Sequence, residues 1–179
     1  MKEDGMHYNR TARLLHWSTA LIVLLIIALG IWITWAPPED EGLKLRLYNI
    51  HESFGITILL VTLFRLFWRW RHPPPPITPP LPGWMQAAAT ANHRAFYALL
   101  LVQPVIGLLN TNAWGFPLIA FGLVPIPSPI GRNEALAPTL STIHDTIGLV
   151  LAGLVALHAG AALWHHLIRR DDTLRRMTW

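Results

Sequence analysis

Residues 142–168 read TIHDTIGLVLAGLVALHAGAALWHHLI, an apolar segment with one acidic residue and no Lys or Arg. A helix needs about 20 mostly apolar residues to cross the hydrocarbon core of a bilayer. The segment lacks the strict alternation of apolar and polar positions that a membrane strand shows. It therefore predicts a membrane-spanning α-helix. Two of its four histidines, His144 and His158, lie within the span and predict that this helix carries a function, because ionisable groups are costly in a membrane.

Three other segments have the same character, so the predicted spans are residues 11–35, 45–68, 86–109 and 142–168. The composition agrees, since 53% of the 179 residues are hydrophobic and 13% are charged, against about a quarter charged in soluble proteins. We expect an all-α integral membrane protein, in which residues 1–179 form a single four-helix bundle in the lipid bilayer.

The basic residues predict the orientation, because cytoplasmic loops carry an excess of Lys and Arg. Eleven of the fourteen fall at one end of the predicted bundle: Lys2, Arg10, Arg13, Arg65, Arg69, Arg71, Arg94, Arg169, Arg170, Arg175 and Arg176. Both termini are therefore predicted to be cytoplasmic. The net charge of +4 predicts no nucleic-acid partner, because the basic residues cluster at helix ends instead of along one polar face.

Two loops are distinctive. The cytoplasmic segment 72–82 is rich in proline, which favours a stiff polyproline spacer. The segment 110–140 on the other side is long, apolar and interrupted by prolines. We expect it to lie at the outer interface and to cover part of the bundle.

Histidine is the candidate metal ligand. The absence of cysteine excludes iron–sulfur clusters and covalent haem attachment through C-x-x-C-H. His144 and His158 are 14 residues apart, which on a helix means about 40° and about 21 Å, so they share a face at two depths. The antiparallel path predicts that His51 meets His144 near the outer surface and that His16 meets His158 nearer the cytoplasm. Two bis-histidine sites predict two non-covalent b haems.

A repeated pattern accompanies the predicted outer site: HESFG at residues 51–55 and HDTIG at residues 144–148. Each glycine, Gly55 or Gly148, lies one helical turn after its histidine and on the same face. We expect it to leave room for a flat macrocycle. The alternative is ordinary packing of helices through small residues, which is common in membranes.

The chain resembles the bacterial cytochrome b561 family, and in particular its superoxide oxidase members, over essentially its whole length. The motifs that carry the resemblance are RLLHW (13–17), NIHESFG (49–55), PVIG (104–107), AFGL (120–123), HDT (144–146), LHAGAALWHH (157–166) and DTLRRM (172–177). The resemblance implies an enzyme of the bacterial inner membrane, a superoxide:ubiquinone oxidoreductase, which oxidises periplasmic superoxide to oxygen and reduces ubiquinone. The family's four haem ligands match His16, His51, His144 and His158. Its quinone site matches His165, with His93 and Arg71 as neighbours.

Three basic residues on the predicted outer side, Lys44, Arg46 and Arg132, are the candidates for attracting the superoxide anion, since a positive cleft raises the encounter rate. Nearby acidic residues at positions 39–41 oppose this attraction.

Two other functions fit the same residues. The first is a cytochrome b membrane anchor that passes electrons between a dehydrogenase or hydrogenase partner and quinone; a chain that ends just after its fourth helix favours the stand-alone enzyme. The second is a divalent-metal transporter that uses histidines with Glu52 and Asp145, which predicts a colourless protein.

Overall fold

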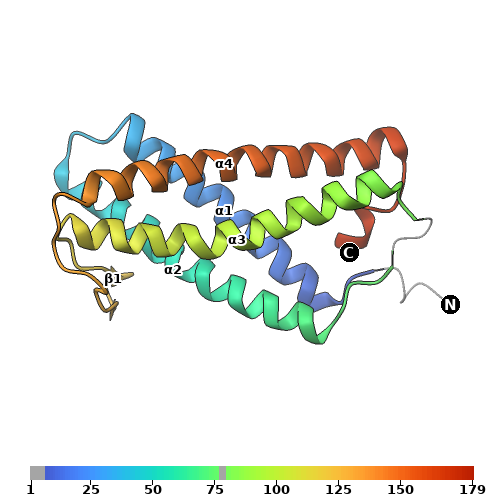
Figure 1. The fold of residues 1–179 in the computed structure, drawn as a ribbon, viewed down its shortest axis with the longest axis horizontal. Helices are drawn as coiled ribbons and strands as arrows, with labels where there is room; N and C mark the ends of the chain where they lie inside the picture. Colours follow the sequence, from blue (N-terminus) through green and yellow to red (C-terminus); the bar gives the residue numbers. More distant parts are fainter. Residues whose placement is uncertain (1–6, 77–79) are drawn as a thin grey trace.

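The computed structural model describes residues 7–76 and 80–179. Its long helices are α1 (Arg10–Trp35), α2 (Glu41–Arg71), α3 (Gly83–Ala113) and α4 (Ala137–Trp164). All four are long and apolar enough to cross a membrane. They run along the long axis of the molecule, with α1 packed on α2, α2 on α3 and α3 on α4 (Figure 1). The predicted all-α membrane bundle is confirmed. Lys2 and residues 77–79 of the proline-rich spacer lie outside the described residues.

Each helix begins before the apolar segment that predicted it, and in α2 a polar capping residue sets the start. Helix α2 begins at Glu41 instead of residue 45, since the side chain of Asp40 accepts a hydrogen bond from the amide of Leu43 at 2.6 Å. Helix α4 begins at Ala137, with proline in its first turn, where a missing N–H costs nothing. It ends at Trp164 and continues as a π-helix over His165–Arg169.

The centre of the bundle is apolar and draws on every long helix. Val23 of α1, Ile58 of α2, Leu100 of α3 and Leu151 of α4 are buried and form one cluster. Many other leucine, isoleucine and phenylalanine side chains point outward and are exposed. That distribution suits a bundle whose outer surface contacts lipid tails, which are as apolar as leucine.

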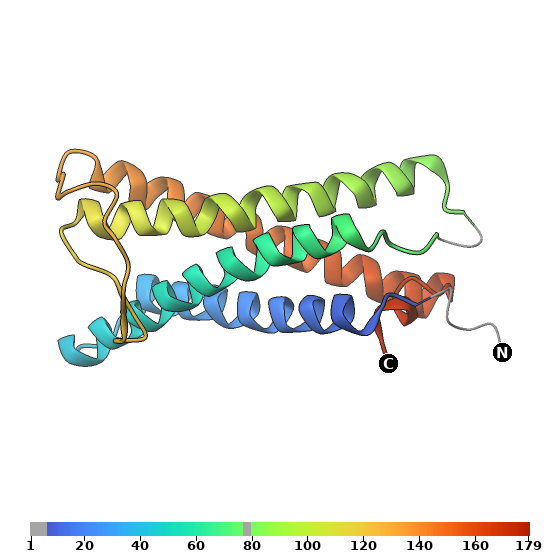
Figure 2. The same cartoon turned by 90° about the horizontal axis from the view of Figure 1, so that it is seen from below.

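The loop between α3 and α4 covers the beginning of α2. It contains a small antiparallel hairpin of β1 (Ile119–Ala120) and β2 (Val124–Pro125). Asn49 of α2 donates a side-chain hydrogen bond to the carbonyl of Ile119 at 2.8 Å, and Ser53 Oγ accepts one from the amide of Phe121 at 2.7 Å. Figure 2 shows the loop leaving α3, crossing to α2 and returning to α4. The structure agrees with the prediction that this segment covers part of the bundle.

The C-terminal segment closes the opposite end of the bundle. Arg13 and Trp17 of α1 donate side-chain hydrogen bonds to the carbonyls of Thr178 at 2.6 Å and Met177 at 2.7 Å. Arg176 is buried and donates to the carbonyl of Pro75 in the proline-rich spacer. The start of α1, the spacer and the end of the chain therefore meet at one end. Its cytoplasmic location stays a prediction.

Candidate functional site

The four membrane histidines lie in two pairs across the bundle. His51 of α2 faces His144 of α4 with ring centroids 6.1 Å apart, and His16 of α1 faces His158 of α4 at the same separation. We call His51 and His144 the outer pair and His16 and His158 the inner pair, after the predicted orientation. These are the partners that the antiparallel path of the chain predicts.

The spacing within each pair suits a metal ion held between two imidazoles. A histidine–metal bond is about 2 Å long, so two coordinating nitrogens on opposite sides of one ion lie about 4 Å apart. The ring centroids lie farther out than the nitrogens, which makes 6.1 Å a fitting separation. Two histidine rings that only pack against each other have no fixed separation. Packing alone therefore does not explain why both pairs have the same spacing.

A cavity surrounds the outer pair. Its volume is about 760 Å³, and residues of all four long helices line it, including His51 and His144. Pockets for cofactors and other small molecules usually measure about 300–1,000 Å³, so the cavity has room for a macrocycle. Gly55 and Gly148 also line it. A Cβ atom at Gly55 would meet no atom within 4 Å, whereas one at Gly148 would lie 3.4 Å from Nε2 of Gln103.

Two glycines that the sequence analysis gave no role contact the outer histidines directly. A Cβ atom at Gly30 of α1 would lie 3.0 Å from Cε1 of His51, and one at Gly107 of α3 would lie 3.0 Å from Cε1 of His144. Each outer histidine therefore packs against a glycine of the preceding helix. A glycine inside an apolar helix is a known sign of close packing, but the sequence does not say which residue approaches it.

The inner pair lies among aromatic and basic side chains. The ring of His158 contacts that of His93, with centroids 5.7 Å apart. Arg65 of α2 donates a hydrogen bond to Nδ1 of His16 at 3.0 Å and lies over the ring of Tyr97. If iron takes the lone pair of Nε2, the remaining ring proton sits on Nδ1. A haem at this pair therefore requires Arg65 to release His16.

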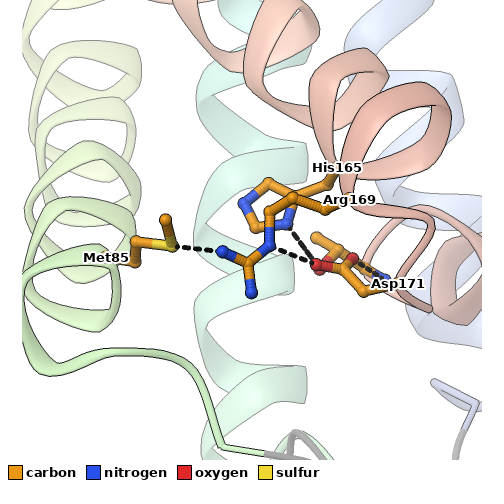
Figure 3. Close-up of polar contacts among 5 residues, drawn as sticks. Met85, His165, Arg169 and Asp171 are labelled. Carbon is orange, nitrogen blue, oxygen red and sulfur yellow. Dashed lines mark hydrogen bonds and ion pairs between the residues drawn. The ribbon is translucent and has the colours of Figure 1, made fainter.

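His165 lies beyond the inner pair, toward the closed end of the bundle. It follows His158 by seven residues, which places it on the same helix face about 10 Å farther along. Its Nδ1 lies 2.6 Å from Oδ2 of Asp171, and Arg169 Nε donates to the same oxygen at 3.1 Å (Figure 3). Asp171 could not be identified from the sequence, since no helical spacing relates a residue beyond a helix end to one inside it.

The structure separates the candidate residues for superoxide capture. Lys44 lines the outer cavity and forms an ion pair with Glu41 at 3.3 Å. Arg46 and Arg132 are exposed and do not line it, and Arg132 pairs with Glu134 at 2.5 Å. The outer cavity therefore offers the anion one of the three predicted basic side chains.

The side chain of Arg71, a candidate neighbour of the quinone, contacts a tryptophan of its own helix. Its exposed side chain rests over the ring of Trp70. In the part of the chain that the structure describes, no hydrogen bond joins it to His93 or His165. Within the same residues, no three or more His, Asp or Glu side chains gather into a site for a bare metal ion.

Known proteins match the chain over nearly its full length. The family model described as "Prokaryotic cytochrome b561" matches residues 7–179. Cytochrome b561 homolog 2 of Escherichia coli (strain K12) is 32% identical over 170 residues, covering 95% of this chain and 90% of that protein. Cytochrome b561 homolog 1 of the same strain is 32% identical over 174 residues, covering 95% of this chain and 96% of that protein. A probable superoxide oxidase, CybB of Yersinia pestis, is 35% identical over 168 residues, covering 91% of this chain and 90% of that protein.

Proposed function

Because the chain belongs to the prokaryotic cytochrome b561 family, we propose that it takes electrons from periplasmic superoxide and delivers them to ubiquinone. The family makes it a membrane electron-transfer protein that binds haem b, and with its four apolar helices it is a multi-pass protein of the bacterial inner membrane. The resemblance and localisation predicted from the sequence are confirmed. The choice of superoxide as donor draws on the similarity to the probable superoxide oxidase.

The proposal includes two b haems, because the two histidine pairs have the same spacing. His51 and His144 would hold the outer haem, and His16 and His158 the inner one. Haem iron with two histidine ligands is six-coordinate and supplies one-electron transfer without binding a substrate at the metal. The cavity lined by all four helices supports the outer site.

The outer cavity is the proposed place where superoxide gives up its electron. Two superoxide anions yield two molecules of oxygen and two electrons. Lys44 lines the cavity and attracts the anion, since a positive side chain near a low-dielectric wall raises the local concentration of a negative reactant. Glu41, its ion-pair partner at 3.3 Å, weakens that attraction.

The quinone is proposed to bind near the inner pair, beside His93 and His165. His93 contacts the ring of His158, so a quinone there would lie close to the inner haem. Reduction of one ubiquinone to ubiquinol consumes the two electrons and two protons. Imidazole exchanges protons readily near neutral pH and suits a proton donor to a quinone oxygen. We assign no quinone contact to Arg71, because its side chain is exposed over Trp70.

The test uses the purified, haem-loaded protein in detergent. We expect two extractable b haems per chain with low-spin spectra, and rapid haem reduction when superoxide is generated. His51→Ala and His144→Ala should remove one haem, and His16→Ala and His158→Ala the other. One haem per chain would refute the two-site proposal. No reduction by superoxide, together with a dehydrogenase or hydrogenase that co-purifies at fixed stoichiometry, would support the membrane-anchor function instead.

A further inference from the structure

The backbone at the end of α4 brings Asp171 back onto His165. After the π-helical turn over His165–Arg169, Arg170 adopts a left-handed conformation with φ 56°, which reverses the chain. The amide of Asp171 then donates to the carbonyl of His165 at 3.2 Å. The two side chains meet as well, with His165 Nδ1 2.6 Å from Asp171 Oδ2 (Figure 3). Non-glycine residues rarely adopt positive φ, so the left-handed conformation of Arg170 is unusual.

The carboxyl group of Asp171 is held in its ionised form. Burial alone would raise the pKa of Asp171, but hydrogen bonds from His165 and Thr173 lower this pKa to about 2. An ionised carboxylate has no proton to donate. In the hydrogen bond between the two side chains, the proton must therefore lie on Nδ1 of His165. The other ring nitrogen, Nε2, remains for a second partner, and Figure 3 shows it on the side of the ring away from Asp171.

Arg169 is the other charged residue that contacts Asp171 among the described residues. Its Nε donates to Oδ2 of Asp171 at 3.1 Å, its Nη1 donates to Sδ of Met85 on α3 at 3.3 Å, and its guanidinium lies over the ring of Trp164. The ring of His165 also contacts Trp164 edge-on. Arg169 and His165 thus share one carboxylate oxygen and compete for its negative charge.

We infer that Asp171 is the positioning residue of the proposed quinone site, which fixes the tautomer of His165 and places a negative charge against its ring. The inference rests on the proposed function. In the step that it serves, protonated Nε2 of His165 gives one proton to a quinone carbonyl oxygen. The reduced protein supplies two electrons, and water from the cytoplasmic side supplies the second proton and later reprotonates His165. Ubiquinol results, and Asp171 keeps its negative charge throughout.

The experiment compares four variants with the wild type: Asp171→Asn, Asp171→Glu, Arg169→Gln and Asp172→Asn. Asp172 is the matched control, because it is the adjacent acid and contacts Arg175 at 3.5 Å instead of His165. The haems are reduced chemically, a short-chain ubiquinone is added in a stopped-flow instrument, and haem oxidation is followed over a range of pH. Haem content and melting temperature are measured on every sample.

The signs of the expected shifts are specific. A quinone reduction that needs protonated His165 slows as pH rises. Loss of the opposite charge in Asp171→Asn disfavours a protonated imidazole, so the alkaline side of the pH–rate profile, where the rate falls, should move to lower pH. Asp171→Glu should restore most of the rate. Arg169→Gln removes a competing positive charge and should move the alkaline side of the profile to higher pH, a direction that general destabilisation does not produce. Asp172→Asn should not move it.

The outcomes separate this inference from the proposed function. A His165→Ala variant that reduces quinone at the wild-type rate would refute the quinone site and the role of Asp171 with it. A slow His165→Ala combined with a wild-type pH profile in Asp171→Asn would refute the positioning role alone. If Asp171→Asn loses haem, the pH profile of Arg169→Gln becomes the test. A profile in Arg169→Gln that does not move to higher pH would then refute the positioning role of Asp171.

Discussion

His51 lies so close to Gly30 that a Cβ atom on Gly30 would come within 3.0 Å of Cε1 of its ring. His144 and Gly107 have the same relationship, at the same distance, in the other helical hairpin. The two hairpins therefore present their outer histidines in the same way, each over a glycine of the preceding helix. The two outer histidines also begin the same sequence pattern of histidine, acid, hydroxyl, apolar residue and glycine.

Gly30→Ala and Gly107→Ala should each weaken the outer haem site. The added methyl group must displace the histidine ring, and overpacking of this kind costs about 1–3 kcal/mol, so the affinity for the outer haem should fall by about five- to 150-fold. Haem content measured after dialysis against a haem-binding protein checks this. Gly153→Ala is the control, because its Cβ atom would meet no atom within 4 Å. Equal haem loss in all three variants would contradict the prediction.

Arg65→Gln should lower the reduction potential of the inner haem. Arg65 contacts His16 in the structure and must release it when haem binds, but its place on α2 keeps the guanidinium beside the inner pair, and a positive charge near an iron centre favours its reduced form. Its removal should shift the potential by on the order of tens of millivolts in a potentiometric titration followed by absorbance. The potential of the outer haem should stay unchanged. Arg10→Gln, at the exposed start of α1, is the control, and an equal shift there would show that the effect is not local.

Lys44→Glu should slow haem reduction by superoxide more than Arg46→Glu or Arg132→Glu does. Lys44 is the member of this set that lines the outer cavity, so its charge acts nearest the proposed encounter site. The slowing should be several-fold at low salt and should fade above about 0.1 M ionic strength, where the Debye length falls to about 10 Å. Stopped-flow reduction at several salt concentrations measures it. Equal slowing by all three charge reversals would show that the net charge of the protein, and not the position of Lys44, attracts superoxide.

The contact between Asp171 and the C-terminal segment should loosen in acid. Because the pKa of Asp171 is lowered to about 2 from an ordinary 3.8, its ionised form adds stability that is fully present above about pH 4. That stability is lost as the pH falls toward 2. Hydrogen exchange at the amide of Thr173, which donates to Asp171 at 3.0 Å, should accelerate over this window beyond the intrinsic trend. Asp171→Asn should abolish the extra acceleration, and an unchanged profile in that variant would disprove the linkage.

Apolar length and histidine spacing predicted most of the architecture. Four long apolar segments give four helices, since lipid leaves the backbone few alternatives. The 14-residue spacing of His144 and His158 places them on one face, and the antiparallel path brings His51 and His16 beside them. These inferences succeed because helical periodicity and chain direction relate the residues directly. The start of α2 at Glu41 was missed because a capping hydrogen bond, not hydropathy, sets it.

The features that could not be predicted depend on contacts between elements or on irregular backbone. Gly30 and Gly107 matter because of the rotation of one helix against the next, which the spacing within a single helix does not contain. The pairing of His165 with Asp171 depends on a π-helical turn and a left-handed Arg170, for which the local sequence has no glycine signal. The positive charge of Arg65 helps to predict the orientation of the bundle, but charge counting does not show that its side chain reaches into the bundle to His16.

Both histidine pairs take one member from α4, and this has a consequence for biosynthesis. A nascent chain that has inserted only its first three helices contains His16 and His51 but neither of their partners. If the two pairs bind haem as proposed, no complete ligand pair exists until translation has finished the last helix, so a prematurely terminated chain would remain colourless. Pigmentation of the membrane would then report full-length insertion.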